Sequence, residues 1–357
     1  MVKYKRLLEC VPNFSEGSNT QILDQIADAV SSVDGVSLLN VDPGRATNRT
    51  VFTFIGEPEA VVEAAFRAEQ KAQELIDMRF HKGEHPRIGA TDVLPLVPIE
   101  GVTMEEAVAL ARQLSKRVGE ELGIPVYCYE NAASMPSRRN LAACRSGQYE
   151  GLKLKISSAD WKPDFGPCEF NSSVARSGAS VIGARDFLLA VNFNLNTTSV
   201  ELATDVAYDV RERGRAKREG DMASGKKIID ENGNVVMVPG TLKGVKAIGW
   251  YIEEYGIAQV SMNITDMNLT PLHKAFEEVS AKAAARGLRV TGTEIIGLLP
   301  LRAIVEAGEY YLNRQHCQTT NIAESEIVKI AVRSMGLSDI TPFDPNKKII
   351  EYLIEHR

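Results

Sequence analysis

The sequence is poor in cysteine and has no long apolar run. Its five cysteines are scattered along 357 residues with no C-x-x-C pair; they are Cys10, Cys128, Cys144, Cys168 and Cys317. An odd, scattered set argues against a disulfide framework and favours reduced thiols. No segment approaches the roughly 18 consecutive apolar residues of a membrane span, and the N-terminus lacks the apolar core of a signal peptide. The sequence therefore predicts a cytoplasmic protein with no membrane partner.

The sequence also lacks an excess of positive charge. Its 41 Lys and Arg residues against 47 Asp and Glu residues give a formal net charge of −6. Broad nucleic-acid binding usually needs a basic surface, so no nucleic-acid partner is expected, although a local basic patch for an anionic substrate is compatible with this charge. The length suffices for one large domain or two medium ones.

What the sequence does contain is one order of strand and helix signals, present twice. The first round predicts strands at 7–11, 36–41, 50–55 and 93–99, a helix capped by Ser18 or Asn19, and a helix at 58–78. The second predicts strands at 187–193, 245–251, 257–264 and 290–299, with helices at 198–213 and 271–286. Both rounds have the order β-α-β-β-α-β, whose short turns favour mixed or antiparallel sheets. We therefore expect an α/β (α+β) fold of two subdomains, residues 1–184 and 185–357.

Other segments lie outside this repeat. A helix is predicted at 104–122 and a strand at 125–129, followed by loop and short helix over 134–167. Asp42-Pro43-Gly44 is expected to form a turn. Asn232-Gly233 predicts a hairpin within 214–244, to which we assign no chemistry. Two helices at 324–336 and 346–356 complete the second subdomain.

The segment HKGEHPR contains His81 and His85, four residues apart. Zinc-binding H-E-x-x-H needs this spacing on a helix, but Gly83 and Pro86 are hostile to a helix interior, and no third ligand is evident, so no metal is expected. An imidazole can also take and give a proton near neutral pH. The residues alone leave open whether either histidine is catalytic or a surface or structural residue.

Two other segments are candidates for binding. In NVDPGRATNRT, Asp42 ends a strand and could orient an imidazolium, while Arg45 and Arg49 could bind carboxylates; a plain turn with solvated arginines is the alternative. The loop DWKPDFGPCEFNSS suits a flat heterocyclic ligand, or is only a connector. SVIGAR and GDMASGKK lack the G-x-x-x-x-G-K-[ST] pattern, so nucleotide binding is not supported.

Several longer motifs occur in a fixed order along the chain. They are ECVPNFSEG, LLNVDPGRATNRTVFTFIG, GEHPRIGATDVLPLVPI, GVTMEEAV, PDFGP, GARDFLLAVNFNL, VKAIGWYIEE, AQVSMNITD and IIEYL. Together they resemble the glutamate formimidoyltransferase family, the folate-dependent transferases of histidine degradation, from about Leu8 to Leu353. The resemblance implies two α/β subdomains whose sheets face each other, with helices outside and ligands in a crevice between the subdomains. It also implies transfer of the formimino group from N-formimino-L-glutamate to N5 of tetrahydrofolate, with no metal.

The resemblance also assigns residues. His85 is implied as the catalytic acid/base and Asp42 as its assistant, and a pKa of His85 near neutrality would serve both roles. Arg45, Arg49 and Arg87 are the nearest basic residues, and at least one is expected to bind a substrate carboxylate. The implied folate-binding residues are Gly166, Pro167, Cys168, Glu169, Phe170, Asn171, Ser172, Ser173, Val174 and Ala175. The sequence after Phe170 and the length of 214–244 depart from the animal enzymes.

Alternatives to this function remain open. A related one-carbon enzyme that acts on 5-formyltetrahydrofolate would share the folate loop and His85. A non-catalytic folate-binding module would bind folate without turnover. The expected partners are formiminoglutamate, tetrahydrofolate, a second copy of the chain in a homodimer, and a separate cyclodeaminase for the next step of the pathway.

Overall fold

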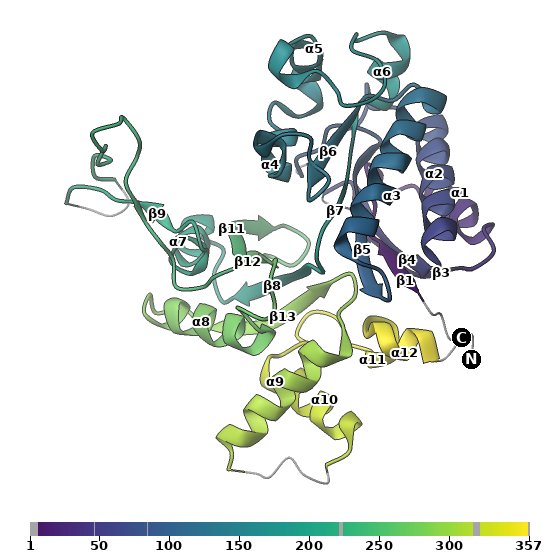
Figure 1. Cartoon of the computed structure of the whole chain (residues 1–357). Coiled ribbons are helices and arrows are strands. Elements are labelled where there is room, and N and C mark those ends of the chain that lie inside the picture. The colour runs from purple at the N-terminus through teal and green to yellow at the C-terminus, as the bar shows by residue number, and fades with distance from the viewer. Residues whose placement is uncertain (1–5, 46, 84, 221–223, 317–321, 356–357) are drawn as a thin grey trace. The chain divides into compact units, whose positions relative to one another are not determined.

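The chain forms two compact units, Met1–Phe187 and Leu188–Arg357 (Figure 1). The computed structural model describes residues 6–45, 47–83, 85–220, 224–316 and 322–355. Cys317 lies outside these residues; Cys10, Cys128 and Cys144 are buried free thiols, and Cys168 is a half-buried one. Within the described ranges, no helix has the length and apolar character to cross a bilayer.

The first unit is built on a seven-stranded mixed sheet. Its strands are β1 (Leu7–Cys10), β2 (Asn13–Phe14), β3 (Val36–Gly44), β4 (Arg49–Gly56), β5 (Thr91–Glu100), β6 (Val126–Glu130) and β7 (Ser180–Ala184). The order across the sheet is β3-β4-β1-β5-β7-β6, and β2 continues β1 between the same two neighbours. All pairs are antiparallel except β5 with β7 and β7 with β6, which are parallel.

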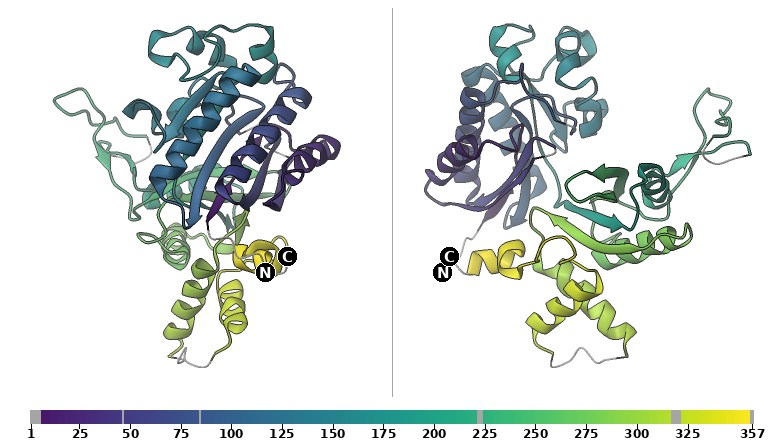
Figure 2. Two further views of the ribbon diagram at one scale, coloured as in Figure 1. Left: turned by 45° about the vertical axis from the view of Figure 1, so that its right-hand side comes forward. Right: turned by 180° about the vertical axis from the view of Figure 1, so that it is seen from behind.

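Helices cover both faces of this sheet. Successive strand residues point to opposite faces, so both faces carry side chains that the helices bury. On one face lie α1 (Thr20–Ser31), α2 (Pro58–Leu75) and α3 (Met104–Arg117), which continues into a π-helical turn at Val118–Leu122 (Figure 2). On the other face, α4 (Leu141–Cys144), α5 (Gln148–Ile156) and α6 (Ser172–Ser177) belong to a core around Tyr127, Tyr129 and Val181. Asn19 caps α1 as predicted, by accepting from the N–H groups of Gln21 and Ile22.

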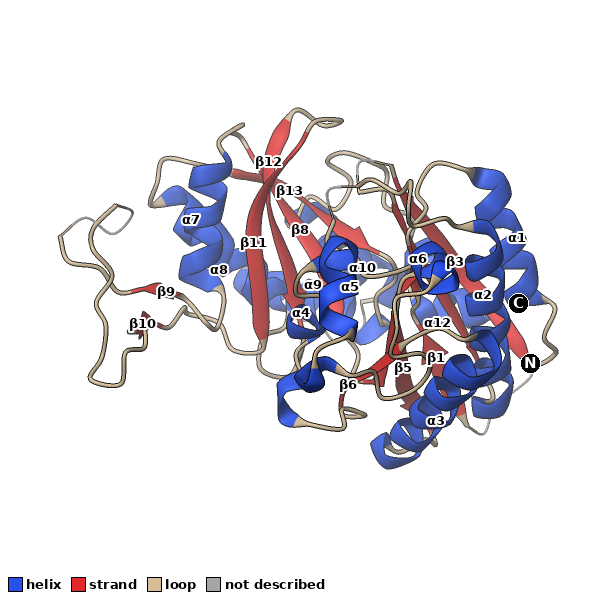
Figure 3. Cartoon of the chain, turned by 90° about the horizontal axis from the view of Figure 1, so that it is seen from above, coloured by secondary structure: helices blue, strands red, loops and turns tan. Residues whose placement is uncertain are grey.

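The second unit repeats the arrangement of β3, β4, β1 and β5. Its antiparallel sheet has the order β11 (Val245–Ile252), β12 (Ile257–Ile264), β8 (Leu189–Leu195), β13 (Val290–Ile296). Helices α7 (Val200–Val210) and α8 (Leu272–Ala284) cover one face (Figure 3), where the Phe193 and Phe276 ring centroids are 6.2 Å apart. The predicted β-α-β-β-α-β order is thus confirmed in both units.

The remaining elements of the second unit are peripheral. The predicted hairpin at Asn232-Gly233 is present: Ile229 bridges with Val235, and the turn places Gly233 at φ 81°. At the base of the insertion, β9 (Arg215–Ala216) pairs with β10 (Met237–Val238) (Figure 2). The C-terminal helices are α9 (Leu301–Arg314), α10 (Glu324–Ser334), α11 (Pro345–Lys348) and α12 (Ile350–Glu355).

The structure departs from the predicted elements at four places. Asp42-Pro43-Gly44 is not a turn but the end of β3, paired with residues 49–51; since β3 is an edge strand, Pro43 needs no ladder partner for its nitrogen. Strand β7, weighed only as a phosphate loop, and helix α9 were not predicted. The helix predicted at 346–356 is divided at Ile349, whose extended backbone forms a bridge with Leu299.

Candidate active site

Three connections converge at one end of the first unit's sheet. In their described parts they are residues 15–19, residues 45 and 47–48 between β3 and β4, and residues 76–83 and 85–90 before β5. Asn48 ties them together, because its Oδ1 accepts from the Gly17 N–H at 2.9 Å and its Nδ2 donates to the Lys82 carbonyl at 2.8 Å. A Cβ atom on Gly17 would lie 2.3 Å from the Gly44 oxygen, and one on Gly83 would lie 2.4 Å from the Thr47 oxygen. These two glycines therefore allow the backbones to pack in direct contact.

His81 has a structural place within this cluster. Its Nδ1 accepts from the Arg87 Nε–H at 3.1 Å, so its Nε2 carries the proton and donates to the Asn48 carbonyl at 2.9 Å. Burial, with a smaller effect from Arg87, lowers the pKa of His81. His81 is therefore a neutral side chain that ties its own connection to Asn48 of the connection between β3 and β4.

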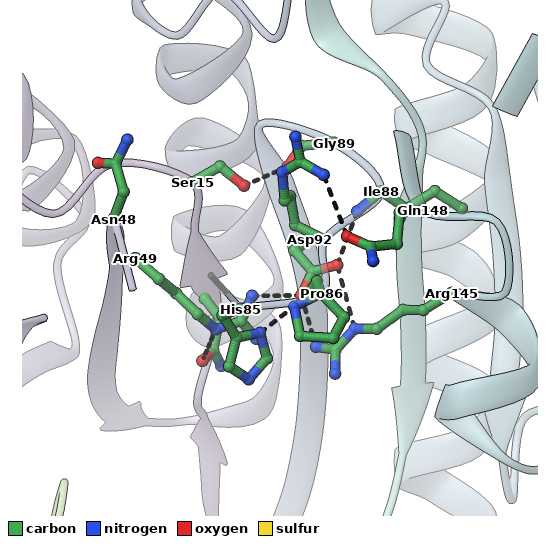
Figure 4. A network of polar contacts seen from close by, with 12 residues as sticks. Ser15, Asn48, Arg49, His85, Pro86, Ile88, Gly89, Asp92, Arg145 and Gln148 are labelled. Atoms are coloured by element: carbon green, nitrogen blue, oxygen red, sulfur yellow. Dashed lines mark hydrogen bonds and ion pairs between the residues drawn. The ribbon is translucent and has the colours of Figure 1, made fainter. Parts of the chain in front are cut away.

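His85 differs in the use of its nitrogens (Figure 4). Its Nδ1 lies 2.7 Å from the Pro86 carbonyl oxygen. A carbonyl only accepts, so Nδ1 carries the proton and the neutral ring keeps a basic lone pair on Nε2. Burial and then the positive charges of Arg49 and Arg145 lower the pKa of His85 to about 3, below the expected near-neutral value. His85 is therefore neutral near pH 7.

Beside His85, two arginines converge on one buried carboxylate; we call Arg49 and Arg145 the arginine pair. Asp92 is fully buried, and its Oδ2 accepts from Arg49 Nη1 and from Arg145 Nη2. Its Oδ1 accepts from Arg145 Nε at 3.1 Å and from the Ile88 N–H at 3.0 Å. Burial alone would raise the pKa of Asp92, but Arg145 and Arg49 lower it to about 2. Burial, and to a lesser degree Arg145, lower the pKa of Arg49 to about 10, with Asp92 opposing.

Asp92 and Arg145 are the site residues that the sequence interpretation missed. Asp92 had a detectable signal, a lone acid at the start of the apolar run DVLPLVPI. Arg145 had none, because it lies in an irregular segment and meets Asp92 only through the fold.

The other predicted arginines lie elsewhere. Arg87 is buried, and its guanidinium donates to the Glu150 carboxylate at 2.6 and 2.8 Å and to His81. Arg45 is exposed on the connection between β3 and β4. Of the three predicted substrate-binding arginines, the structure brings only Arg49 into the cluster with His85 and Asp92.

Asp42 lies on the sheet face that also carries Arg49. It is half-buried in β3 and stands opposite Val51, which in turn stands opposite Asn13 of β2. Asn13 accepts from Arg49 Nε at 3.1 Å, which joins this row to the arginine pair. The partner of His85 Nδ1 is the Pro86 carbonyl rather than Asp42. A catalytic role for Asp42 stays a prediction.

The predicted folate loop adjoins the histidine segment. Backbone hydrogen bonds join residues 88–90 to residues 177–179, with Ala90 N–H to Ser177 O at 2.7 Å and Ala179 N–H to Ile88 O at 3.1 Å. The Phe170 ring centroid is 6.4 Å from that of Tyr149, whose N–H donates to the Arg87 carbonyl.

Most of this loop is accessible. Within 166–175, only Val174 is buried, and Asn171 caps α6 through Val174 N–H. The exposed residues are Glu169, Asn171, Ser172 and Ser173; the half-buried ones are Gly166, Pro167, Cys168, Phe170 and Ala175. The loop and His85 therefore lie on neighbouring segments of one unit.

Known proteins resemble the chain over nearly its whole length. The family model "Formiminotransferase domain, N-terminal subdomain" matches residues 7–185, and "Formiminotransferase domain" matches residues 190–355. Formimidoyltransferase-cyclodeaminase of Rattus norvegicus is 46% identical over 98% of this chain, which spans about 60% of that relative's length. Glutamate formimidoyltransferase of Thermoplasma acidophilum is 42% identical over 91% of this chain and 98% of its own length. Glutamate formimidoyltransferase of Streptococcus pyogenes is 39% identical over 86% of this chain and 93% of its own length. These matches confirm the resemblance seen in the sequence, and the chain belongs to the formiminotransferase domain family.

Proposed function

We propose that this chain transfers the formimino group of N-formimino-L-glutamate to N5 of tetrahydrofolate, which yields 5-formiminotetrahydrofolate and L-glutamate. The observation that carries the proposal is the state of His85. Its Nδ1 is fixed to the Pro86 carbonyl, its Nε2 is left basic, and it stands beside the arginine pair in a chain of this family. Tetrahydrofolate is a co-substrate, and residues 166–175 are its proposed binding loop.

The first step is addition. N5 of tetrahydrofolate attacks the carbon of the protonated formimino group, the C=N π electrons move to the imino nitrogen, and His85 Nε2 takes the proton that N5 loses. The neutral tetrahedral adduct re-forms the C=N bond when the glutamate nitrogen leaves. Holding the two reactants in attack geometry supplies several kcal/mol of the barrier, and a general base adds about 10²–10⁴-fold. Asp42, on the face that carries Arg49, is proposed to stabilise the charge that His85 acquires.

The second step is elimination. The imidazolium returns its proton to the glutamate nitrogen, the bond from that nitrogen to the formimino carbon breaks, and L-glutamate leaves. The arginine pair disfavours the imidazolium and so makes it a strong acid toward the leaving nitrogen. A substrate carboxylate near these arginines would cancel part of their charge and raise the pKa of His85 toward the range that proton transfer needs.

The setting of the reaction is also a proposal. We infer a cytoplasmic homodimer whose product passes to a cyclodeaminase. The relatives named formimidoyltransferase-cyclodeaminase, in which the two names are joined, support the link to a cyclodeaminase. The compartment and the dimer are proposed from the sequence interpretation alone.

The decisive experiment measures glutamate release from N-formimino-L-glutamate with and without tetrahydrofolate. We expect release that depends on the folate, with one 5-formiminotetrahydrofolate formed per glutamate. Turnover of 5-formyltetrahydrofolate with ATP, and none of formiminoglutamate, would establish the related one-carbon enzyme instead. Folate binding without turnover of either substrate would leave a binding module.

A further inference from the structure

The arginine pair carries more positive charge than its protein partner neutralises. Two guanidinium groups face a single carboxylate, and all three groups are largely buried: the side chain of Asp92 is 0% exposed, that of Arg49 9% and that of Arg145 13%. An uncompensated charge in such surroundings is costly unless an anion completes the set. The arginine pair can therefore bind one further anionic group beside Asp92.

The donors that remain point to the kind of anion. Arg49 uses Nε on Asn13 and Nη1 on Asp92, while Arg145 uses Nε and Nη2 on Asp92. Among the residues that the structure describes, no acceptor engages Arg49 Nη2 or Arg145 Nη1. Because both side chains converge on Asp92 Oδ2, the two free amino groups belong to neighbouring guanidiniums (Figure 4). A carboxylate, with two oxygens in one plane, matches two such donors.

The backbone turn that carries Arg145 is held in place by hydrogen bonds from Lys155. Lys155 of α5 donates from Nζ to the carbonyls of Ala143 at 3.0 Å, Cys144 at 2.6 Å and Ser146 at 3.1 Å. Its Nζ also lies 3.9 Å from the Trp161 ring centroid. These contacts hold the backbone on both sides of Arg145, so its side chain is oriented before any ligand arrives.

We propose that Arg145, together with Arg49, binds the α-carboxylate of the formimino amino acid, with Asp92 and Lys155 as positioning residues. The assignment rests on the proposed function and on distance along the substrate. His85 must reach the amino acid nitrogen, and the arginine pair is next to His85. The α-carboxylate is two bonds from that nitrogen, whereas the distal carboxylate is four bonds away, so only the α-carboxylate fits beside the histidine.

The test pairs variants of the full chain with substrate analogues. N-formimino-4-aminobutyrate keeps the distal carboxylate but lacks the α-carboxylate, and N-formimino-2-aminobutyrate has the reverse. With formiminoglutamate and with the 2-aminobutyrate analogue, Arg145→Gln should lower kcat/KM about 100-fold, mainly through KM. Arg145 also acts on the pKa of His85, so its removal changes kcat on all three substrates alike, and the carboxylate assignment is read from KM. With the 4-aminobutyrate analogue, whose missing carboxylate the arginine cannot bind, KM should change by less than about threefold.

Three further variants complete the design. Arg139→Gln removes the same charge from an exposed position on the same segment. This control should leave kcat/KM unchanged with formiminoglutamate and with both analogues. Arg145→Lys keeps the positive charge but lacks the two parallel N–H donors of a guanidinium. Its KM should therefore lie between that of the parent chain and that of Arg145→Gln. Lys155→Met should repeat the pattern of Arg145→Gln across the analogues in weaker form, which a purely structural defect would not do.

The outcomes separate the two proposals. An equal increase in the KM of Arg145→Gln on all three substrates, or an increase that follows the distal carboxylate, would overturn the α-carboxylate assignment while leaving formimino transfer intact. If the parent chain turns over no formimino substrate, the proposed function fails, and calorimetric titration with L-glutamate then decides the inference alone. L-2-aminobutyrate and 4-aminobutyrate, which each carry one of the two carboxylates, are titrated beside it. Binding of L-glutamate and L-2-aminobutyrate that Arg145→Gln abolishes would support the α-carboxylate site, and binding that the variant leaves unchanged would refute it.

Discussion

The two units have the same strand order but elaborate opposite ends of their sheets. In the first, the link before the fourth strand of the repeat is long, residues 76–90, and carries His81, His85 and Arg87. In the second, the same link is the short stretch 285–289, and the long insertion, 211–244, stands at the other end, before β11. The repeated core is a scaffold, and the proton carrier proposed here, His85, lies in a link that is longer than the connection needs.

The units also differ in how they bury polar groups. The first buries charges, with Asp92 between two arginines. The second has an amide network on the face of its sheet opposite α7 and α8, where Gln259 donates to Asn194 at 2.8 Å and Asn192 donates to Glu294 at 3.0 Å. Buried charges cost more to leave unpaired than buried amides do. In the first unit two arginines share one carboxylate, whereas in the second unit the buried Arg215 contacts two carboxylates, those of Asp205 and Asp209. The excess of positive charge at Asp92 is one that an anionic ligand can relieve.

The largest expected effect contrasts two imidazoles. His85→Ala should lower turnover by at least about 10³-fold while folate still binds, because the proton carrier is lost and the loop at 166–175 is untouched. Steady-state assays and a fluorescence titration with tetrahydrofolate measure the two quantities. The control is His273→Ala in the second unit, where His273 stacks on Tyr310 at 4.3 Å. Similar losses in both variants would remove His85 from the mechanism.

The second contrast substitutes one carboxylate in each unit. Asp92→Asn leaves the arginine pair without its counter-charge and should lower the free energy of unfolding by about 3 kcal/mol. Glu294→Gln keeps an acceptor for Asn192 and should cost about 1 kcal/mol. Chemical unfolding of the full chain gives both values, and equal costs would break the comparison. Because the pKa of Asp92 is lowered to about 2, its stabilisation is present above its unfolded pKa and is lost as pH falls through about 2.

A third test concerns the carboxyl group that the first unit buries without an arginine. Burial raises the pKa of Glu69 in α2 to about 8. The stability this group contributes is therefore complete below its unfolded pKa and is lost as pH rises toward 8. Glu69→Gln should abolish this dependence, so its advantage over the parent should grow by about 1 kcal/mol per pH unit between pH 5 and pH 7.5. Thermal melts across that range measure it, and parallel curves for the two proteins would contradict a buried neutral acid.

The smallest effect is expected from the insertion of the second unit. Its base is fixed by Arg215, which contacts Asp205 and Asp209. Replacing residues 217–236 by Gly-Gly joins Ala216 to Met237, which are already cross-strand partners. We expect a change in unfolding free energy within about 0.5 kcal/mol and unaltered kcat/KM. A large loss of turnover would show that both ends of the repeat serve the reaction.

The order of strands and helices could be predicted from the sequence better than the residues of the site. Alternating apolar residues and turn signals such as Asn232-Gly233 are local, so they predicted the repeated order and the hairpin. Strand β7 escaped because its five buried residues form a short run without polar alternation. The choice of His85 over His81 came from family resemblance alone; the physical difference, a free Nε2 against two occupied nitrogens, depends on contacts with Asn48, Arg87 and Pro86 that only the fold creates.

The tight packing around Gly17 and Gly83 has a consequence for anyone who redesigns this protein. Neither position has space for a methyl group, so the packing of these backbones against Gly44, Thr47 and Asn48 cannot be altered by substitution there. A library aimed at new amino acid substrates should keep both glycines fixed and randomise Arg145 together with its exposed neighbours. Substrate selectivity could then be varied while the backbone packing at the two glycines stays unchanged.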